Sequence, residues 1–266
     1  MSSPQADRAQ SLTFVVLVLV VAWAAAPLAD GLVLALSPLL VTVVMVAGSS
    51  RRSRSRDLRL GVRSAGWPWW WVALGSTAGV TSIAYLLLLG VGLVEPRAAD
   101  QQTAVDLLVL IVTGMVLAFC EEIGWRGYLQ PRVAGWAGRR GSYLVVGAVW
   151  VGWHLAYIAR TDGYHADGNR LVVLTLFSLS VMAFAIVFGE LRDRSGSVWP
   201  AVVAHMAHNV AFAWLGTSML RTEHPVVVEE YLVGDTGLLV LVGTVLVALA
   251  LLRHGGVGSH PERTPT

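Results

Sequence analysis

Long apolar runs, separated by short polar or helix-breaking segments, dominate the chain. They consist mainly of leucine, valine and alanine, and several approach the ~20 residues that an α-helix needs to cross a bilayer. The pattern predicts eight membrane-spanning helices, at residues 12–29, 31–48, 67–94, 105–129, 142–159, 171–189, 197–216 and 236–253. We therefore expect an all-α fold, a polytopic transmembrane helix bundle.

The first two of these spans allow a second interpretation. Only Asp30 and Gly31 separate them, and Pro27 and Pro38 interrupt their interiors. Because proline removes a helical hydrogen bond, the two runs could form one broken or re-entrant unit instead of two helices. The count of eight takes them as two.

Composition agrees with a membrane-embedded chain. Of the 266 residues, 55% are hydrophobic and only 14% are charged. The basic residues fall between the apolar runs and do not alternate with exposed aromatic side chains, so we expect no nucleic-acid partner. The single cysteine, Cys120, excludes an internal disulfide and every multi-thiolate metal site.

The segment 49–66 carries the main cluster of positive charge and indicates the orientation. Its basic residues are Arg51, Arg52, Arg54, Arg56, Arg59 and Arg63. By the positive-inside rule this segment is cytoplasmic, and an even number of spans then puts both termini in the cytoplasm, with the protein in the cell membrane. The tail from Gly255 to Thr266 is expected to be disordered.

Strongly polar residues inside three of the predicted spans are the main indication of function. A charged side chain at the bilayer centre costs at least ~2.5–3.5 kcal/mol, so such residues are rare unless they are paired, lie in a cavity or do chemistry. They are Glu121 and Glu122 in the fourth span, His154 in the fifth, and His205, His208 and Asn209 in the seventh. Their depths along the helices predict a site between the fourth, fifth and seventh helices.

Helical spacing divides these residues by role. Glu122 and Arg126 stand four apart with the acid first, which favours an intrahelical ion pair. Glu121 points about 100° away from Glu122 and is expected to stay free, as a catalytic acid would. His205 and Asn209 are also four apart, so both can face one water molecule, metal ion or oxyanion.

These side chains are sufficient to hydrolyse a peptide bond. A carboxylate beside another one in low dielectric can take a proton from water and return it to the leaving amine. Histidines supply metal ligands or hydrogen bonds that hold the water, and an amide such as Asn209 can donate to an oxyanion. His208 lies near the face of His205 and could assist, or could serve only as an interhelical hydrogen-bonding group.

Three motifs resemble those of the CPBP family of intramembrane endopeptidases, also called the ABI or type II CAAX-protease family. They are Glu-Glu-x-x-x-Arg at 121–126, Phe-x-x-x-His at 150–154 and His-x-x-x-Asn at 205–209. The resemblance covers roughly residues 105–216, which we take as a catalytic core between an N-terminal region (1–104) and a C-terminal region (217–266). Trp150 departs from the pattern, because the family has phenylalanine there.

The resemblance implies a role for each motif residue. Glu121 would activate water, His154 would help to hold it, and His205 with Asn209 would bind or stabilise the oxyanion. The supporting residues would be Glu122, Arg126 and His208. Members of the family are commonly called metalloproteases, and Glu121, His154 and His205 fit an open zinc site as well as a metal-free arrangement, so zinc is left open.

The sequence therefore favours a membrane endopeptidase that cleaves a membrane-associated peptide or protein, and two other classes stay open. A non-catalytic adaptor or bacteriocin-immunity-type protein could keep the same fold. A proton- or metal-coupled transporter could also use buried Glu and His, although transporters usually contain inverted repeats and none is evident. Neither the substrate, prenylated or not, nor the oligomeric state is predicted.

Overall fold

The computed structural model describes residues 3–48, 58–62, 66–161 and 167–254. Most of the arginine-rich segment 49–66 and the tail at 255–266, for which the sequence predicts a cytoplasmic loop and disorder, lie outside these ranges.

The described chain is helical almost throughout. The helices are α1 (Pro4–Ala25), η1 (Leu28–Gly31), α2 (Leu32–Ala47), α3 (Trp67–Leu74), η4 (Gly75–Gly79), α4 (Val80–Gly90), α5 (Gln101–Glu122), η5 (Ile123–Leu129), α6 (Gln130–Arg160), α7 (Arg170–Ser195), α8 (Trp199–Trp214), η6 (Leu215–Met219), η7 (Val226–Leu232) and α9 (Leu238–His254). Two short strands, β1 (Glu95–Pro96) and β2 (Leu220–Arg221), pair antiparallel and join the segments after α4 and η6. The all-α prediction is confirmed.

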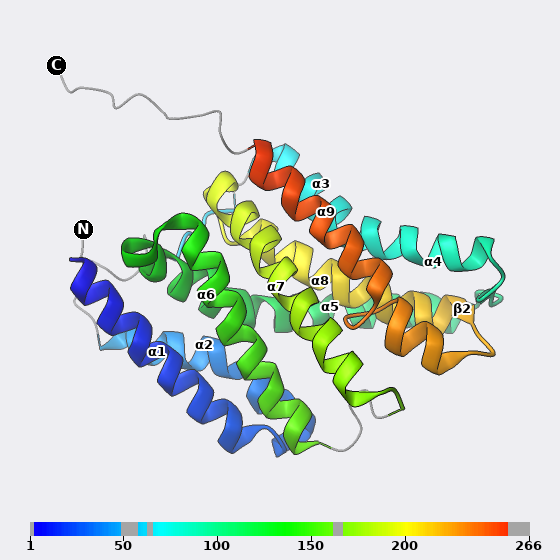
Figure 1. Ribbon diagram of the computed structural model, residues 1–266, viewed down its shortest axis with the longest axis horizontal. Coiled ribbons are helices and arrows are strands. Elements are labelled where there is room, and N and C mark those ends of the chain that lie inside the picture. Colours follow the sequence, from blue (N-terminus) through cyan, green and yellow to red (C-terminus); the bar gives the residue numbers. More distant parts are fainter. Residues whose placement is uncertain (1–2, 49–57, 63–65, 162–166, 255–266) are drawn as a thin grey trace.

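The helices form one bundle around a shared core (Figure 1). Helix α6 packs against α1 on one side and α7 on the other, α7 packs against α9, and α5 packs along α8. Figure 1 shows the beginning of α1 and the end of α9 toward the same side of the bundle. The elements that carry the motif residues, α5, α6 and α8, are thereby brought together.

Four helical stretches within the described ranges are long and apolar enough to cross a membrane. They are Pro4–Ala25, Trp67–Gly90, Gln101–Arg160 and Arg170–Ser195. Two shorter apolar helices, Leu32–Ala47 and Leu238–Arg253, accompany them. Several apolar helices thus support a membrane protein, whereas the count of eight spans stays a prediction.

The first two apolar runs form separate helices. Helix α1 ends at Ala25, and η1 connects it to α2 through Gly31, whose φ of 82° lies in the left-handed region that glycine adopts without strain. Pro38 is accommodated inside α2. The two apolar runs are therefore two helices, as the count of spans assumed.

The boundary expected between the fourth and fifth spans is displaced. The prediction ended the fourth helix at Leu129, but the helical stretch continues through Gln130 and breaks at Gly138, with φ 73° and ψ 170°. The prediction followed hydropathy, which marks the end of the apolar run and not the end of the helix, so the helical stretch extends past Leu129. The motif Glu121–Arg126 consequently lies inside a longer helical unit.

Candidate active site

The polar residues from three helices line one cavity of about 450 Å³. They are Glu121 from α5, His154 from α6, and His205, His208 and Asn209 from α8. Most of the remaining wall consists of aromatic and aliphatic side chains from α2, α5, α6, α7 and α8. Strongly polar groups therefore converge in a mostly apolar chamber, the usual form of a small-molecule or peptide site.

Glu121 is held by two indoles. Its Oε2 accepts a hydrogen bond from Nε1 of Trp150 at 2.9 Å and a longer one from Nε1 of Trp125 at 3.4 Å. Its Oε1 lies 4.0 Å from Nε2 of His205. The expectation that Glu121 stays free is thus wrong, since tertiary packing supplies neutral donors to one oxygen and leaves the other facing a histidine.

Glu122 forms the predicted ion pair and one further contact. Nη1 of Arg126 lies 2.9 Å from Oε1 of Glu122, and both side chains are fully buried, which confirms the pairing. Nδ1 of His205 lies 3.0 Å from the same oxygen. Because an ionised carboxylate only accepts, Nδ1 of His205 carries a proton. In the neutral form of the ring, Nε2 is then an acceptor, and it lies toward Glu121.

The backbone widens directly after the two glutamates. Helix η5, which begins at Ile123, is a π-helix, and single π turns inside α-helices occur often at functional sites. Gly124 lets η5 approach α2 closely, since a Cβ there would lie 2.6 Å from Cβ and 2.9 Å from the carbonyl oxygen of Pro38. The close contact with α2 thus requires glycine at this position.

His154 is oriented by its own helix and by aromatic rings. Its Nδ1 lies 3.0 Å from the carbonyl oxygen of Trp150, one turn earlier. The carbonyl can only accept, so Nδ1 donates and Nε2 is the acceptor. The rings of Trp153 and Phe177 meet the imidazole edge to face, with centroids 4.7 and 5.0 Å away.

Asn209 and His208 lie farther along α8. His205 and Asn209 both line the cavity, as their spacing predicted. Nδ1 of His208 is 3.5 Å from the hydroxyl of Thr81, and its Nε2 has no hydrogen-bond partner in the described part of the chain. The ring of Phe184 lies 4.4 Å from that of His208, so packing and a weak hydrogen bond fix this histidine.

Residues 103–211 match the family model described as type II CAAX prenyl endopeptidase Rce1-like. This part of the chain is Rce1-like. No protein with a curated description matches the chain.

The Rce1-like segment contains all three motifs and most of the cavity wall. It begins in α5 and ends in α8, close to the boundaries 105–216 expected from the motifs. The helices before and after it complete the wall with residues such as Gly31 in η1 and Asp235 before α9. The resemblance to the type II CAAX-protease family is therefore confirmed for this segment.

Sequence reasoning missed three residues that contact Glu121 or line the cavity, namely Trp125, Trp150 and Asp235. Trp125 lies one helical turn after Glu121, so its spacing was a usable signal. Trp150 stood out only as a departure from a motif, and its indole N–H was the unused clue. Asp235 lines the cavity from the turn between η7 and α9, and no local pattern connects it with the motifs.

The described side chains of the cavity form no ready set of metal ligands. Within the described ranges, no three His, Cys, Asp or Glu residues are grouped so that they could hold one. In the Rce1-like site Nδ1 of His205 faces Glu122, and Nδ1 of His154 faces a carbonyl. The zinc ion on Glu121, His154 and His205 thus stays a prediction, without support from this arrangement.

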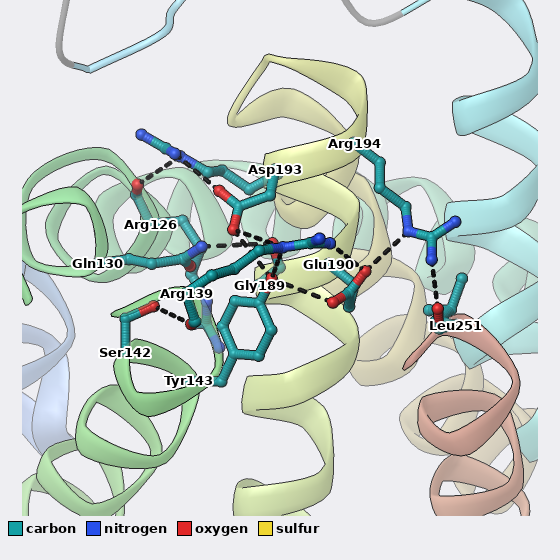
Figure 2. A network of polar contacts seen from close by, with 11 residues as sticks. Arg126, Gln130, Arg139, Ser142, Tyr143, Gly189, Glu190, Asp193, Arg194 and Leu251 are labelled. Carbon is teal, nitrogen blue, oxygen red and sulfur yellow. Dashed lines mark hydrogen bonds and ion pairs between the residues drawn. The ribbon is translucent and has the colours of Figure 1, made fainter. Parts of the chain in front are cut away.

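A polar network joins the Rce1-like site to the end of α7 (Figure 2). Glu190, which is 2% exposed, receives hydrogen bonds from Arg139, Arg194 and Tyr143. Arg192 donates through Nε to the carbonyl oxygen of Arg126 at 3.1 Å. In addition, Nε2 of Gln130 donates to the carbonyl oxygen of Gly189 at 3.3 Å, and Arg194 also reaches the carbonyl oxygen of Leu251 in α9. The network therefore fixes η5 and α6 against α7, and α7 against α9.

Proposed function

We propose that this protein is an intramembrane endopeptidase in which Glu121 activates water for attack on a peptide bond. The observation that carries the proposal is the convergence of Glu121, His154, His205 and Asn209 on one cavity within an Rce1-like segment. The description of that family as an endopeptidase family supports the same reaction class.

The gap between Glu121 and His205 is slightly shorter than a shared water molecule needs, so a small shift of either side chain would admit the attacking water. Oε1 of Glu121 and Nε2 of His205 lie 4.0 Å apart, and with a neutral His205 ring both atoms are acceptors. Two acceptors that share one water molecule are about 4.5 Å apart when each hydrogen bond is about 2.8 Å. A water molecule here would donate one hydrogen to each group and direct a lone pair at the substrate carbonyl.

Hydrolysis then needs one proton to move twice. Glu121 takes a proton from the water as its oxygen bonds to the carbonyl carbon, and the carbonyl oxygen becomes an oxyanion. The amide of Asn209 donates a hydrogen bond to that oxyanion. Glu121 returns the proton to the nitrogen of the scissile bond as the carbon–nitrogen bond breaks, which releases an amine and a carboxylic acid.

The neighbouring groups support this cycle. His154 accepts a hydrogen bond from water through Nε2, while Glu122 keeps the proton of His205 on Nδ1 so that Nε2 stays an acceptor. Arg126 compensates the charge of Glu122. A zinc ion would supply Lewis acidity, and metal analysis of the purified protein, with and without chelator, tests that separate proposal.

The substrate class follows from the environment and from the family. A cavity among apolar helices favours a peptide or protein that is itself associated with the membrane. The family description names CAAX prenyl endopeptidases, so a quenched fluorescent peptide with a farnesylated CaaX end is the first probe, and the same peptide without the lipid is its control. We propose the cell membrane as the location, with both termini cytoplasmic.

Membrane-peptide profiles test the proposal even before the client protein is identified. Cells that carry the intact chain are compared with cells that carry Glu121→Gln, a change that keeps shape and removes the base. Cleavage products should disappear and their precursors should accumulate in the variant. Glu95→Gln is the matched control, because Glu95 is exposed, pairs with Arg221 at 2.8 Å and lies outside the three motifs.

Unchanged product peptides in Glu121→Gln cells, at equal protein level, would refute the endopeptidase. That result would favour the non-catalytic adaptor. Loss of the same products in Glu95→Gln cells would show that the Glu121 effect is not specific to the cavity.

A further inference from the structure

Trp150 contacts two charged residues of the first motif with one ring. Its Nε1 donates to Oε2 of Glu121 at 2.9 Å, and the guanidinium carbon of Arg126 lies 4.6 Å from the centre of its ring. The aromatic face is electron-rich and its N–H edge is electron-poor. The electron-rich face of the Trp150 indole therefore lies against the cation of Arg126, and its electron-poor N–H edge lies against the carboxylate of Glu121.

This placement accounts for atoms that otherwise lack partners. Nε and Nη2 of Arg126 have no hydrogen-bond partner among the described residues, although the side chain is fully buried. The rings of Trp150 and Phe188 lie against its guanidinium, at 4.6 and 5.1 Å. Aromatic faces thus take the place of hydrogen-bond acceptors around this cation.

Trp150 also touches both histidines of the proposed reaction. Its ring packs edge to face on that of His205, with centroids 5.3 Å apart. Its carbonyl oxygen accepts a hydrogen bond from Nδ1 of His154. A phenylalanine, the residue of the family motif, could preserve the ring contacts and the carbonyl. The hydrogen bond from the indole N–H to Glu121 is the contact that phenylalanine could not make.

We propose that Trp150 is a positioning residue that fixes the rotamer of Glu121. The indole binds Oε2 and thereby directs Oε1 toward Nε2 of His205, where the water is activated. Fixing a base within a few tenths of an ångström affects the rate of the chemical step more than substrate binding. This inference rests on the proposed endopeptidase function, and the first test below does not depend on it.

The contact itself is tested by NMR of protein labelled with ¹⁵N in the tryptophan indoles and held in lipid nanodiscs. The chain has 11 tryptophans, so the Nε1–H signals are assigned from their absence in Trp150→Phe and in Trp214→Phe. In Glu121→Gln the Trp150 signal should move upfield, since a hydrogen bond to a neutral amide is weaker than one to a carboxylate. The chemical shift of the Trp214 N–H should not change, because this N–H donates to the carbonyl oxygen of Thr103 outside the cavity.

The positioning role is tested by cleavage of the farnesylated CaaX peptide, or of the client found in the membrane profiles. Trp150→Phe should lower kcat by about 10- to 100-fold, the range for loss of a hydrogen bond to a charged group, and should change KM by less than about twofold. Trp214→Phe, which loses the same atoms outside the cavity, should keep both constants. A structural defect alone would lower the amount of folded enzyme and would not separate kcat per folded molecule from KM in this way.

Each result decides one point. A Trp150 signal that does not respond to Glu121→Gln would overturn the contact, whatever the activity. A responding signal with an unchanged kcat in Trp150→Phe would overturn the positioning role and leave the endopeptidase intact. Cleavage that persists in Glu121→Gln would overturn the proposed function, while the NMR result would still decide the contact.

Discussion

Two buried carboxylates in this molecule, Glu121 and Glu190, have opposite surroundings. Glu190 is surrounded by the guanidinium groups of Arg139 and Arg194 and by the hydroxyl of Tyr143. Glu121 receives indole N–H groups on one oxygen, and its other oxygen faces a histidine at 4.0 Å. Two guanidinium groups hold Glu190 within an ion-pair network, whereas the indole donors of Glu121 occupy one oxygen and leave the other directed at His205. The same side chain is therefore structural at one end of α7 and a candidate base in the cavity.

Apart from a change of Glu121 itself, the largest effect should come from changing His205, which faces Glu121. His205→Gln removes the ring nitrogen proposed to hold the water, so cleavage should fall about 100- to 10,000-fold, the usual contribution of acid–base groups. The melting temperature should change little, because glutamine can still donate to Glu122. Kinetics of the purified variant check this, with His224→Gln, an exposed histidine in the segment after β2, as the control. Activity near that of the intact protein in His205→Gln would remove His205 from the site.

Glu190→Gln should show the reverse behaviour. It removes the carboxylate charge that Arg139 and Arg194 share, although Arg139 keeps Asp193 at 3.5 Å. We expect a loss of about 1–3 kcal/mol in stability, reduced because Arg139 is 44% exposed. Thermal unfolding in detergent or nanodiscs measures the loss, and kcat per folded molecule should stay close to normal. A variant of normal stability with little activity would mean that Glu190 belongs to the reaction.

Gly124→Ala should moderately lower both the stability of the protein and its cleavage rate. The added Cβ would meet the backbone of Pro38, which cannot move as a flexible side chain could, so η5 and α2 must separate. We expect about 1–3 kcal/mol of destabilisation, with a reduced kcat because Glu122 directly precedes η5. Thermal unfolding and kinetics together check this. Gly75→Ala is the control, because no atom lies within 4 Å of a Cβ at that position. A stable, fully active Gly124→Ala protein would contradict the close packing of η5 on α2.

The smallest effect concerns the beginning of α5. Asp100 caps this helix, and hydrogen bonds from the backbone and hydroxyl of Thr103 lower the pKa of the Asp100 carboxyl below its usual 3.8. Since the unfolded chain binds the proton more readily, this contribution is present above about pH 4 and is lost as pH falls through the lower folded value. Asp100→Asn should flatten that acid dependence slightly in thermal scans between about pH 5 and pH 3. If the melting temperature falls equally steeply with pH in both proteins, the Asp100 cap is not the source of the acid dependence.

The sequence was sufficient to predict the helical class, the Rce1-like resemblance and the Glu122–Arg126 ion pair, since each depends on local spacing or on a motif. Trp125, four residues after Glu121, was predictable from its spacing, whereas the closer partner, Trp150, depends on tertiary packing. Trp150 is 29 residues away, and no periodicity shows which way its indole points. Asp235 lies outside the Rce1-like segment, so only the folded bundle brings it to the cavity. The helix end at Leu129 was misplaced because hydropathy marks where the apolar run ends, and the helix continues into polar residues.

The most direct test is the initial cleavage rate of the purified chain in lipid nanodiscs, measured for the intact protein, Glu121→Gln and Glu190→Gln with the same prenylated peptide or identified client. The account predicts a rate at background for Glu121→Gln in a protein of unchanged stability, and near-normal cleavage per folded molecule for Glu190→Gln. Substantial cleavage by folded Glu121→Gln protein would contradict the claim that Glu121 is the base.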